Sequence, residues 1–93
     1  MSVKIMIPTP LRAFTEKNAA VYFEGTTVGE ILQKLTTKHG ELKKHLYAED
    51  GTLRKFVNVY VNNDDIRYLK NADTPVKETD VVSIIPSIAG GRM

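Results

Sequence analysis

Phe56-Val57-Asn58-Val59-Tyr60-Val61 is the clearest secondary-structure signal of this chain, because every second residue is valine. Successive side chains of a β-strand point to opposite faces, so the three valines share one face. Valine favours the half-buried surface of a sheet, and we expect this face to pack against a helix. Phe56, Asn58 and Tyr60 then lie on the opposite face. The stretch predicts a strand with one buried face and a second face that carries two aromatic side chains.

The sequence after this strand predicts a turn, an edge strand and a central strand. Asn62-Asn63-Asp64-Asp65 has turn-forming composition, and Ile66-Arg67-Tyr68-Leu69 can return as a short edge strand. Lys77-Glu78-Thr79-Asp80 indicates a further turn. Val81-Val82-Ser83-Ile84-Ile85 is almost continuously apolar, which is typical of a central strand covered on much of both faces.

A helix is predicted before the strand, over the residues between Thr27 and Gly40. Thr27 and Glu30 form a capping-box pattern, in which the two side chains satisfy backbone N–H groups at a helix start. Gly40, after Lys38 and His39, is placed to stop the helix. The apolar residues recur at helical spacing and are predicted core: Val28, Ile31, Leu32 and Leu35. Residues 41–47 can form a short second turn, and residues 48–51 have the composition of a further turn.

Two strands are predicted at the start of the chain. Apolar residues alternate over residues 2–7 until Pro8 and Pro10 end the run, and residues 20–23 are rich in strand-forming side chains. The connection over residues 9–18 makes them a hairpin with a long loop. The whole order is ββαββ, with the last strand beside the first. We therefore expect an α+β fold in which a mixed sheet wraps on one helix.

Composition restricts the class of protein. The chain has 93 residues, enough for one small domain, and its 42% hydrophobic and 26% charged residues are ordinary globular usage. A net charge of +2 is too small to predict nucleic-acid binding, and the cations at Lys38, Lys43, Lys44, Arg54 and Lys55 are interpreted as a solvated face. The absence of cysteine excludes thiol catalysis and disulfides. Residues 1–5 show no apolar segment or cleavage site, so we expect a cytoplasmic protein without membrane contact.

Competing catalytic and metal sites are weak in this sequence. His39 and His45 are six residues apart, which is a poor spacing for two ligands on one helix face, so no metal is predicted. Asp64 and Asp65 fit turn formation better than paired acid catalysis. Ser83 and Ser87 have no histidine base nearby in the sequence. We expect no catalytic residue.

The chain ends in Ala89-Gly90-Gly91-Arg92-Met93, which places two glycines beyond the last apolar run. Glycine lacks a Cβ atom, so Gly90 and Gly91 can pass through a channel too narrow for any side chain. Ala89 and Gly90 are the residues expected to thread that channel. Five extended residues from Ser87 to Gly91 reach about 16 Å. We expect a domain over residues 1–87 and a flexible tail over residues 88–93 that presents a terminal carboxylate to a partner.

The architecture and the diglycine resemble the ubiquitin-like β-grasp fold, and three stretches resemble its prokaryotic sulfur carriers: residues 7–12, 56–67 and 82–91. These carriers are relatives of the molybdopterin-synthase small subunit and of the thiamine-pathway carrier. The stretch from Phe56 to Arg67 is most similar to the carrier of cysteine biosynthesis. One departure is clear, because Arg92 and Met93 follow the diglycine. In some family members a short extension is removed by a zinc metalloprotease, so this chain resembles a masked precursor.

The resemblance implies a carrier that other enzymes modify, and not an enzyme. An adenylating partner would activate Gly91 with ATP after removal of Arg92 and Met93, and a sulfur source would convert it to a thiocarboxylate. A sulfur-accepting synthase of cysteine or homocysteine formation would then take the sulfur. The carrier itself would bind no cofactor and would be monomeric when free.

Two further functions remain open on the sequence. The chain could serve molybdopterin or thiamine formation, including as the small subunit of a two-chain enzyme, or it could be a non-covalent ubiquitin-like binding module. In each case the partner surface is predicted on the sheet face away from the helix. Its expected residues are apolar or aromatic: Met6, Phe56, Tyr60, Ile85 and Ile88.

Overall fold

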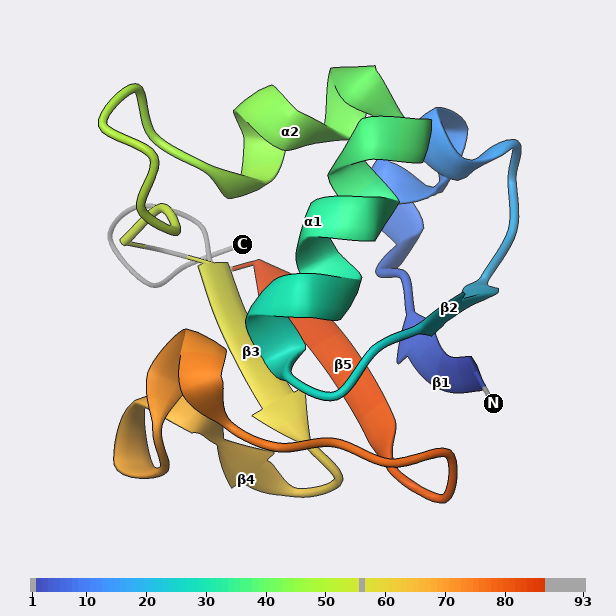
Figure 1. Cartoon of the computed structure of the whole chain (residues 1–93). Helices are drawn as coiled ribbons and strands as arrows, with labels where there is room; N and C mark the ends of the chain where they lie inside the picture. The colour runs from blue at the N-terminus through green and yellow to red at the C-terminus, as the bar shows by residue number, and fades with distance from the viewer. Residues whose placement is uncertain (1, 56, 87–93) are drawn as a thin grey trace.

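The computed structural model describes residues 2–55 and 57–86, which form one mixed sheet with helices on one side (Figure 1). The strands are β1 (Ser2–Met6), β2 (Ala20–Glu24), β3 (Val57–Val61), β4 (Asp64–Asp65) and β5 (Val81–Pro86). Their order across the sheet is β2-β1-β5-β3-β4. β1 pairs in parallel with β5, and the other neighbours are antiparallel. The predicted topology, with the last strand beside the first, is confirmed.

Helix α1 (Val28–Lys38) crosses one face of the sheet (Figure 1). The Thr27 hydroxyl accepts a hydrogen bond from the Glu30 N–H at 3.2 Å, as the capping box predicts. The Glu30 carboxylate reaches one residue further back than expected and accepts from the Thr26 N–H at 2.6 Å. These bonds hold the pKa of Glu30 below its usual value, chiefly through the Thr26 backbone N–H. The helix start is therefore fixed by two hydrogen bonds, one to the Thr27 hydroxyl and one to the Glu30 carboxylate.

The core lies between α1 and the facing side of the sheet. Val57, Val59 and Val61 are all buried, so the predicted parity of β3 is correct. The four predicted apolar positions of α1 are at most 1% exposed. Each such side chain contributes about 1.5–3 kcal/mol by burial. The remaining buried apolar residues are Val3, Ile5, Ile7, Leu11, Leu42, Leu46, Ile66, Val76, Val82 and Ile84.

Two helical segments replace connections predicted as irregular. The 3₁₀ helix η1 (Thr9–Thr15) lies within the long β1–β2 loop, where Leu11 and Thr15 are buried. Helix α2 (Gly40–Leu46) follows α1 at once. Gly40 does not stop α1 in a left-handed conformation, because His39 ends that helix and Gly40 begins the next. Gly51 does adopt a positive φ of 88° in the predicted 48–51 turn.

Two strand predictions were wrong in detail. The chain reverses earlier than expected, because Asn62 adopts a left-handed φ of 58° and the turn needs only Asn62 and Asn63. Asp64–Asp65 therefore form the edge strand β4, and residues 66–68 form the 3₁₀ helix η2 (Ile66–Tyr68), followed by η3 (Asn71–Asp73). The second error concerns β5, which the described residues cover on one face only: Ile84 is buried and Ile85 is 49% exposed.

Candidate functional site: the open face of the sheet

The sheet face opposite α1 carries one continuous row of side chains across all five strands. The register pairs Met6 of β1 with Ala20 of β2 and with Ser83 of β5. Ser83 in turn pairs with Tyr60 of β3, and Tyr60 pairs with Asp65 of β4. Paired residues point to the same face, about 4.8 Å from strand to strand. We call the sheet surface that contains this row, on the side away from α1, the open face.

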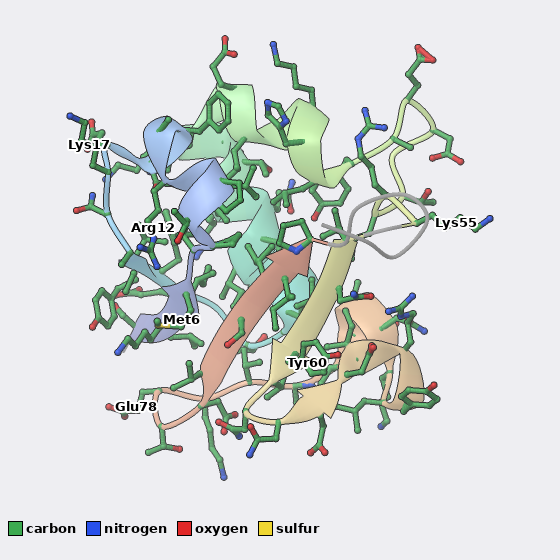
Figure 2. All side chains as sticks on the ribbon, turned by 180° about the vertical axis from the view of Figure 1, so that it is seen from behind. Met6, Arg12, Lys17, Lys55, Tyr60 and Glu78 are labelled. Carbon is green, nitrogen blue, oxygen red and sulfur yellow. The ribbon has the colours of Figure 1, made fainter. Side chains whose placement is uncertain are left out.

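Three of the predicted interface residues meet on the open face around a small side chain. Met6 and Tyr60 flank Ser83 from the two neighbouring strands, and both are half-buried. Ile85 follows two residues later on the same face and is 49% exposed. Figure 2 looks onto this face, with Met6 and Tyr60 on either side of β5. Met6, Tyr60 and Ile85 thus form a partly exposed apolar patch around Ser83, and exposed apolar patches often mark partner surfaces.

The apolar patch lies beside the point where the described chain ends. Ile85 pairs with Asn58, and the next residue, Pro86, pairs with Val57 as the last described residue of β5. The open face therefore sits at the base of the C-terminal tail. The predicted contributions of Phe56 and Ile88 to this face lie outside the described residues. The same is true of the sulfur attachment point and the processed dipeptide, predicted at Ala89, Gly90, Gly91, Arg92 and Met93.

A polar cluster borders the open face at its β4 edge. The Arg67 guanidinium donates to both Asp65 carboxylate oxygens, at 3.3 and 3.1 Å, and also to the side-chain oxygen of Asn58. The Arg67 backbone N–H donates to Asp65 as well, at 2.9 Å. Hydrogen bonds from Arg67 lower the pKa of Asp65, and the same pair raises the pKa of Arg67. The cluster thus holds a planar cation beside the apolar patch of Met6, Tyr60 and Ile85.

Sequence reasoning missed this cluster because it assigned Asp65 to a turn. The Asp65-x-Arg67 spacing was the available signal, since an aspartate commonly accepts a hydrogen bond from the backbone N–H two residues later. The placement of Asn58 opposite the pair could not be deduced, because it depends on where the hairpin reverses. In the structure Asp65 is a hydrogen-bonding anchor for Arg67.

The structure also shows where the residues of the weaker site predictions lie. His45 of α2 stacks on Phe14, with ring centroids 4.4 Å apart, and His39 lies at the junction of the two α-helices. Within residues 2–55 and 57–86, no group of three or more metal-ligating side chains comes together. In the same part of the chain, no helix combines the length and apolarity needed to cross a bilayer. The mid-chain cations predicted to be solvated are exposed.

The fold and the open face define a ubiquitin-like β-grasp protein. The model of the ThiS family matches residues 5–91. Sulfur carrier protein CysO of Mycobacterium tuberculosis is 34% identical over 93 residues, covering 98% of this chain and all of that protein. This chain belongs to the ThiS family.

Solved structures agree in fold over almost the whole length. A chain of the Amycolatopsis orientalis BexX/CysO complex superposes with a TM-score of 0.85 at 38% identity, covering 96% of this chain and 99% of that one. Mycobacterium tuberculosis CysO superposes with a TM-score of 0.84 at 32% identity, covering 92% and 99%. The predicted β-grasp fold and the family resemblance are both confirmed.

Proposed function

We propose that this protein is a sulfur carrier for amino-acid biosynthesis, of the type that forms cysteine or homocysteine. The observation that carries the proposal is the extent of the family match, which ends at Gly91. That boundary separates the diglycine from Arg92 and Met93. Similarity to proteins named sulfur carrier CysO over nearly the entire chain supports the choice of pathway.

The chemistry uses the carboxylate of Gly91 once it is the chain terminus. A carboxylate accepts sulfur only after one oxygen becomes part of a leaving group. A partner enzyme joins the Gly91 carboxylate to the α-phosphorus of ATP and releases pyrophosphate. Sulfide sulfur then attacks the acyl carbon and AMP leaves, which gives a thiocarboxylate. No side-chain thiol is needed, in keeping with a chain that contains no cysteine.

In this proposal the folded domain is the part of the protein that a partner enzyme binds. The apolar patch of Met6, Tyr60 and Ile85 lies beside the end of β5, so a partner that binds the open face would hold Gly91 within reach of its own active site. A tail of about 16 Å from Ser87 to Gly91 spans the distance into a narrow channel. A partner seen with a similar carrier, in the BexX/CysO complex, is consistent with such docking.

Intact-mass spectrometry tests the proposal. The chain ending at Gly91 is incubated with an adenylating enzyme, ATP and a sulfide donor, and we expect a gain of about 16 Da as sulfur replaces oxygen. A reaction without ATP is the control. The absence of this species, under conditions in which the same enzyme thiolates its usual carrier, would refute sulfur carriage and favour a non-covalent binding module.

A further inference from the structure

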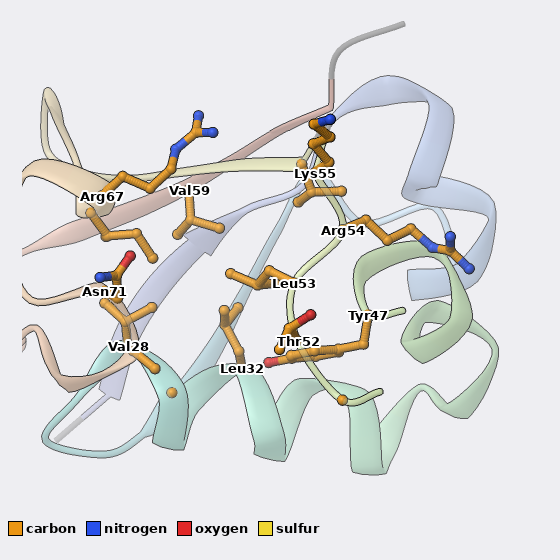
Figure 3. Close-up of a pocket in the computed structure, with 15 residues that line it drawn as sticks. Val28, Leu32, Tyr47, Thr52, Leu53, Arg54, Lys55, Val59, Arg67 and Asn71 are labelled. Atoms are coloured by element: carbon orange, nitrogen blue, oxygen red, sulfur yellow. The ribbon is translucent and has the colours of Figure 1, made fainter. Parts of the chain in front are cut away.

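A pocket of about 510 Å³ opens on the helix side of the sheet, away from the open face (Figure 3). It lies between α1, β3, η2 and the connection over residues 51–55. Its volume is within the range of small-molecule sites. Apolar side chains from these elements line it: Val28, Leu32, Leu53, Val59 and Ile66.

One wall of the pocket is the connection over residues 51–55, which is joined to the end of α2 by backbone contacts. Tyr47 and Leu53 form an isolated antiparallel β-bridge. The Arg54 N–H donates to the Leu46 carbonyl at 2.8 Å. The side chains of Tyr47 and Leu53 also pack against the core. These contacts hold the wall in place without any ligand.

Among the described lining residues, no charged group points into the pocket. Arg54, Lys55 and Arg67 contribute to the lining, but their charged ends point away from it (Figure 3). The Arg54 Nε donates to the Lys44 carbonyl at 2.8 Å, and Arg67 is paired with Asp65. None of these lining residues is acidic. A charged ligand would therefore be buried without an opposite charge, which is costly, so the pocket favours an uncharged ligand.

The Tyr47 hydroxyl points into the apolar part of the pocket. The ring is half-buried, and its hydroxyl lies toward Leu32 (Figure 3). It bonds to no residue in the described ranges 2–55 and 57–86. Buried tyrosine hydroxyls usually have a hydrogen-bond partner. Burial raises the pKa of this phenol, so it stays protonated and able to donate at neutral pH.

The two other uncharged polar side chains of the described lining are less available to a ligand. The Thr52 hydroxyl donates to the Asp50 carboxylate at 2.7 Å. Asn71 is exposed at the opposite end of the pocket from Tyr47, where water competes for its amide (Figure 3). Within the described lining, the interior therefore presents one side-chain donor surrounded by apolar groups.

We propose that this pocket binds an uncharged, mostly apolar molecule whose carbonyl oxygen accepts from the Tyr47 hydroxyl and whose apolar body lies beyond Leu32, against Val28 and Val59. The apolar walls supply affinity, and the phenol selects an acceptor. A ligand hydroxyl would bring a donor as well as an acceptor, and the described side chains of the interior offer that donor no second partner. The site is independent of sulfur carriage, because it uses neither the C-terminal segment nor the open face.

NMR titration of the full chain with three probes of nearly equal shape tests the proposal. Acetophenone, α-methylstyrene and benzoate share a phenyl ring, which carries a neutral carbonyl, an alkene without an acceptor and a carboxylate, respectively. We expect saturable acetophenone shifts in the methyl groups of Val28, Leu32 and Val59. Benzoate should bind at least about fivefold more weakly, because its charge would be buried without a partner.

Removal of one hydroxyl isolates the proposed hydrogen bond. Tyr47→Phe should weaken acetophenone binding about fivefold, as expected for one neutral hydrogen bond, and should leave α-methylstyrene binding unchanged. Tyr68→Phe is the matched control, because it removes the hydroxyl of a tyrosine that is exposed and outside the pocket. It should change neither affinity. Unchanged spectra away from the pocket will confirm that both variants are folded.

Three results would overturn the proposal. An equal effect of Tyr47→Phe on acetophenone and α-methylstyrene, or no effect on either, would reduce the pocket to nonspecific apolar partition. Benzoate binding as tight as that of acetophenone would show that the pocket does not select an uncharged ligand. Acetophenone shifts that do not saturate, or that centre on Met6 and Ile85 of the open face, would show that this pocket is not the binding site.

Discussion

Thr27 fixes the start of α1 through a single hydroxyl, and its removal should be measurable in stability. The hydroxyl accepts from the Glu30 N–H, and Thr27→Ala leaves that donor without a protein partner. We expect a loss of about 1 kcal/mol in the free energy of unfolding, measured with urea. Thr37→Ala is the matched control, because Thr37 is exposed near the end of the same helix and bonds only to the Gln33 carbonyl. It should be neutral or slightly stabilising, since alanine favours helix.

Ionisation of Asp65 should make the stabilisation from the polar cluster depend on pH. Its pKa is lowered from 3.8 by hydrogen bonds from Arg67, so its ionised form is favoured in the folded state. The resulting stability is fully present above pH 3.8 and is lost as the pH falls through the lower folded pKa. Urea unfolding below pH 3.8 should therefore show a smaller acid-induced loss for Asp65→Asn and for Arg67→Gln than for the unmodified chain. Lys70→Gln, an exposed cation in the next turn, should keep the unmodified profile.

An unchanged acid profile in both cluster variants would contradict this assignment. It would mean that the pKa of Asp65 is the same in the folded and unfolded chain, since only a difference between the two states changes stability with pH.

The two faces of strand β3 are expected to have different roles. The face toward α1 stabilises the fold, and the open face binds a partner. Val59 faces α1 and is 2% exposed, whereas Tyr60 lies half-buried on the open face. Val59→Ala should cost about 2 kcal/mol of unfolding free energy. Tyr60→Ala should cost less stability but weaken docking to the adenylating enzyme by about 2 kcal/mol, roughly 30-fold in the KM for the carrier. Tyr68→Ala removes a tyrosine that is 88% exposed on η2 and should change neither quantity.

Circular dichroism and enzyme kinetics together decide this prediction. A loss of folded signal in Tyr60→Ala, with normal KM in any remaining folded protein, would show that the residue is a core element and not a docking anchor.

Strands and helices whose apolar residues recur at a regular spacing could be predicted from the sequence. Whether each of their faces is buried or exposed could be predicted only in part. The alternation in β3 and the spacing of α1 each bury a continuous apolar face, so their element type and parity were correct. β4 has two residues, which is too short for any period to be visible. The apolar run of β5 predicted cover on both faces, but Ile85 on the exposed side belongs to the open face. From the sequence alone, an apolar residue on an exposed face cannot be distinguished from an apolar core residue.

The two sites differ in how far the sequence could reveal them. Met6, Tyr60 and Ile85 were predicted because strand parity and strand order suffice to bring them together. The pocket lined by Leu32 of α1, by Leu53 and by Val59 of β3 (Figure 3) was not predicted, since it depends on how residues 51–55 pass over α1, and irregular connections carry no periodic signal.

At the scale of the whole molecule, β5 lies between β1 and β3 in the middle of the sheet. The described chain ends with Pro86, the last residue of β5, which pairs with Val57 of β3. In the proposed function, a partner that covers the apolar patch around Ser83 would therefore bind beside the residue at which the C-terminal segment begins. The folded domain would supply the binding surface, and the terminal carboxylate would only have to be accessible.

Arg92 and Met93 should mask this carrier until they are removed. While they are attached, Gly91 carries an amide carbonyl and no free carboxylate, so adenylation at Gly91 is chemically impossible. The free carboxylate then belongs to Met93, whose side chain does not suit a channel shaped for glycine. We expect the 93-residue chain to remain unmodified with the adenylating enzyme, ATP and sulfide, and the chain ending at Gly91 to be thiolated without a peptidase. Gly91→Ala in the shorter chain should react poorly, because a Cβ is added where the backbone must approach closely. Intact mass follows all three proteins, and a thiocarboxylate on Met93, or equal rates for the two chain lengths, would contradict masking.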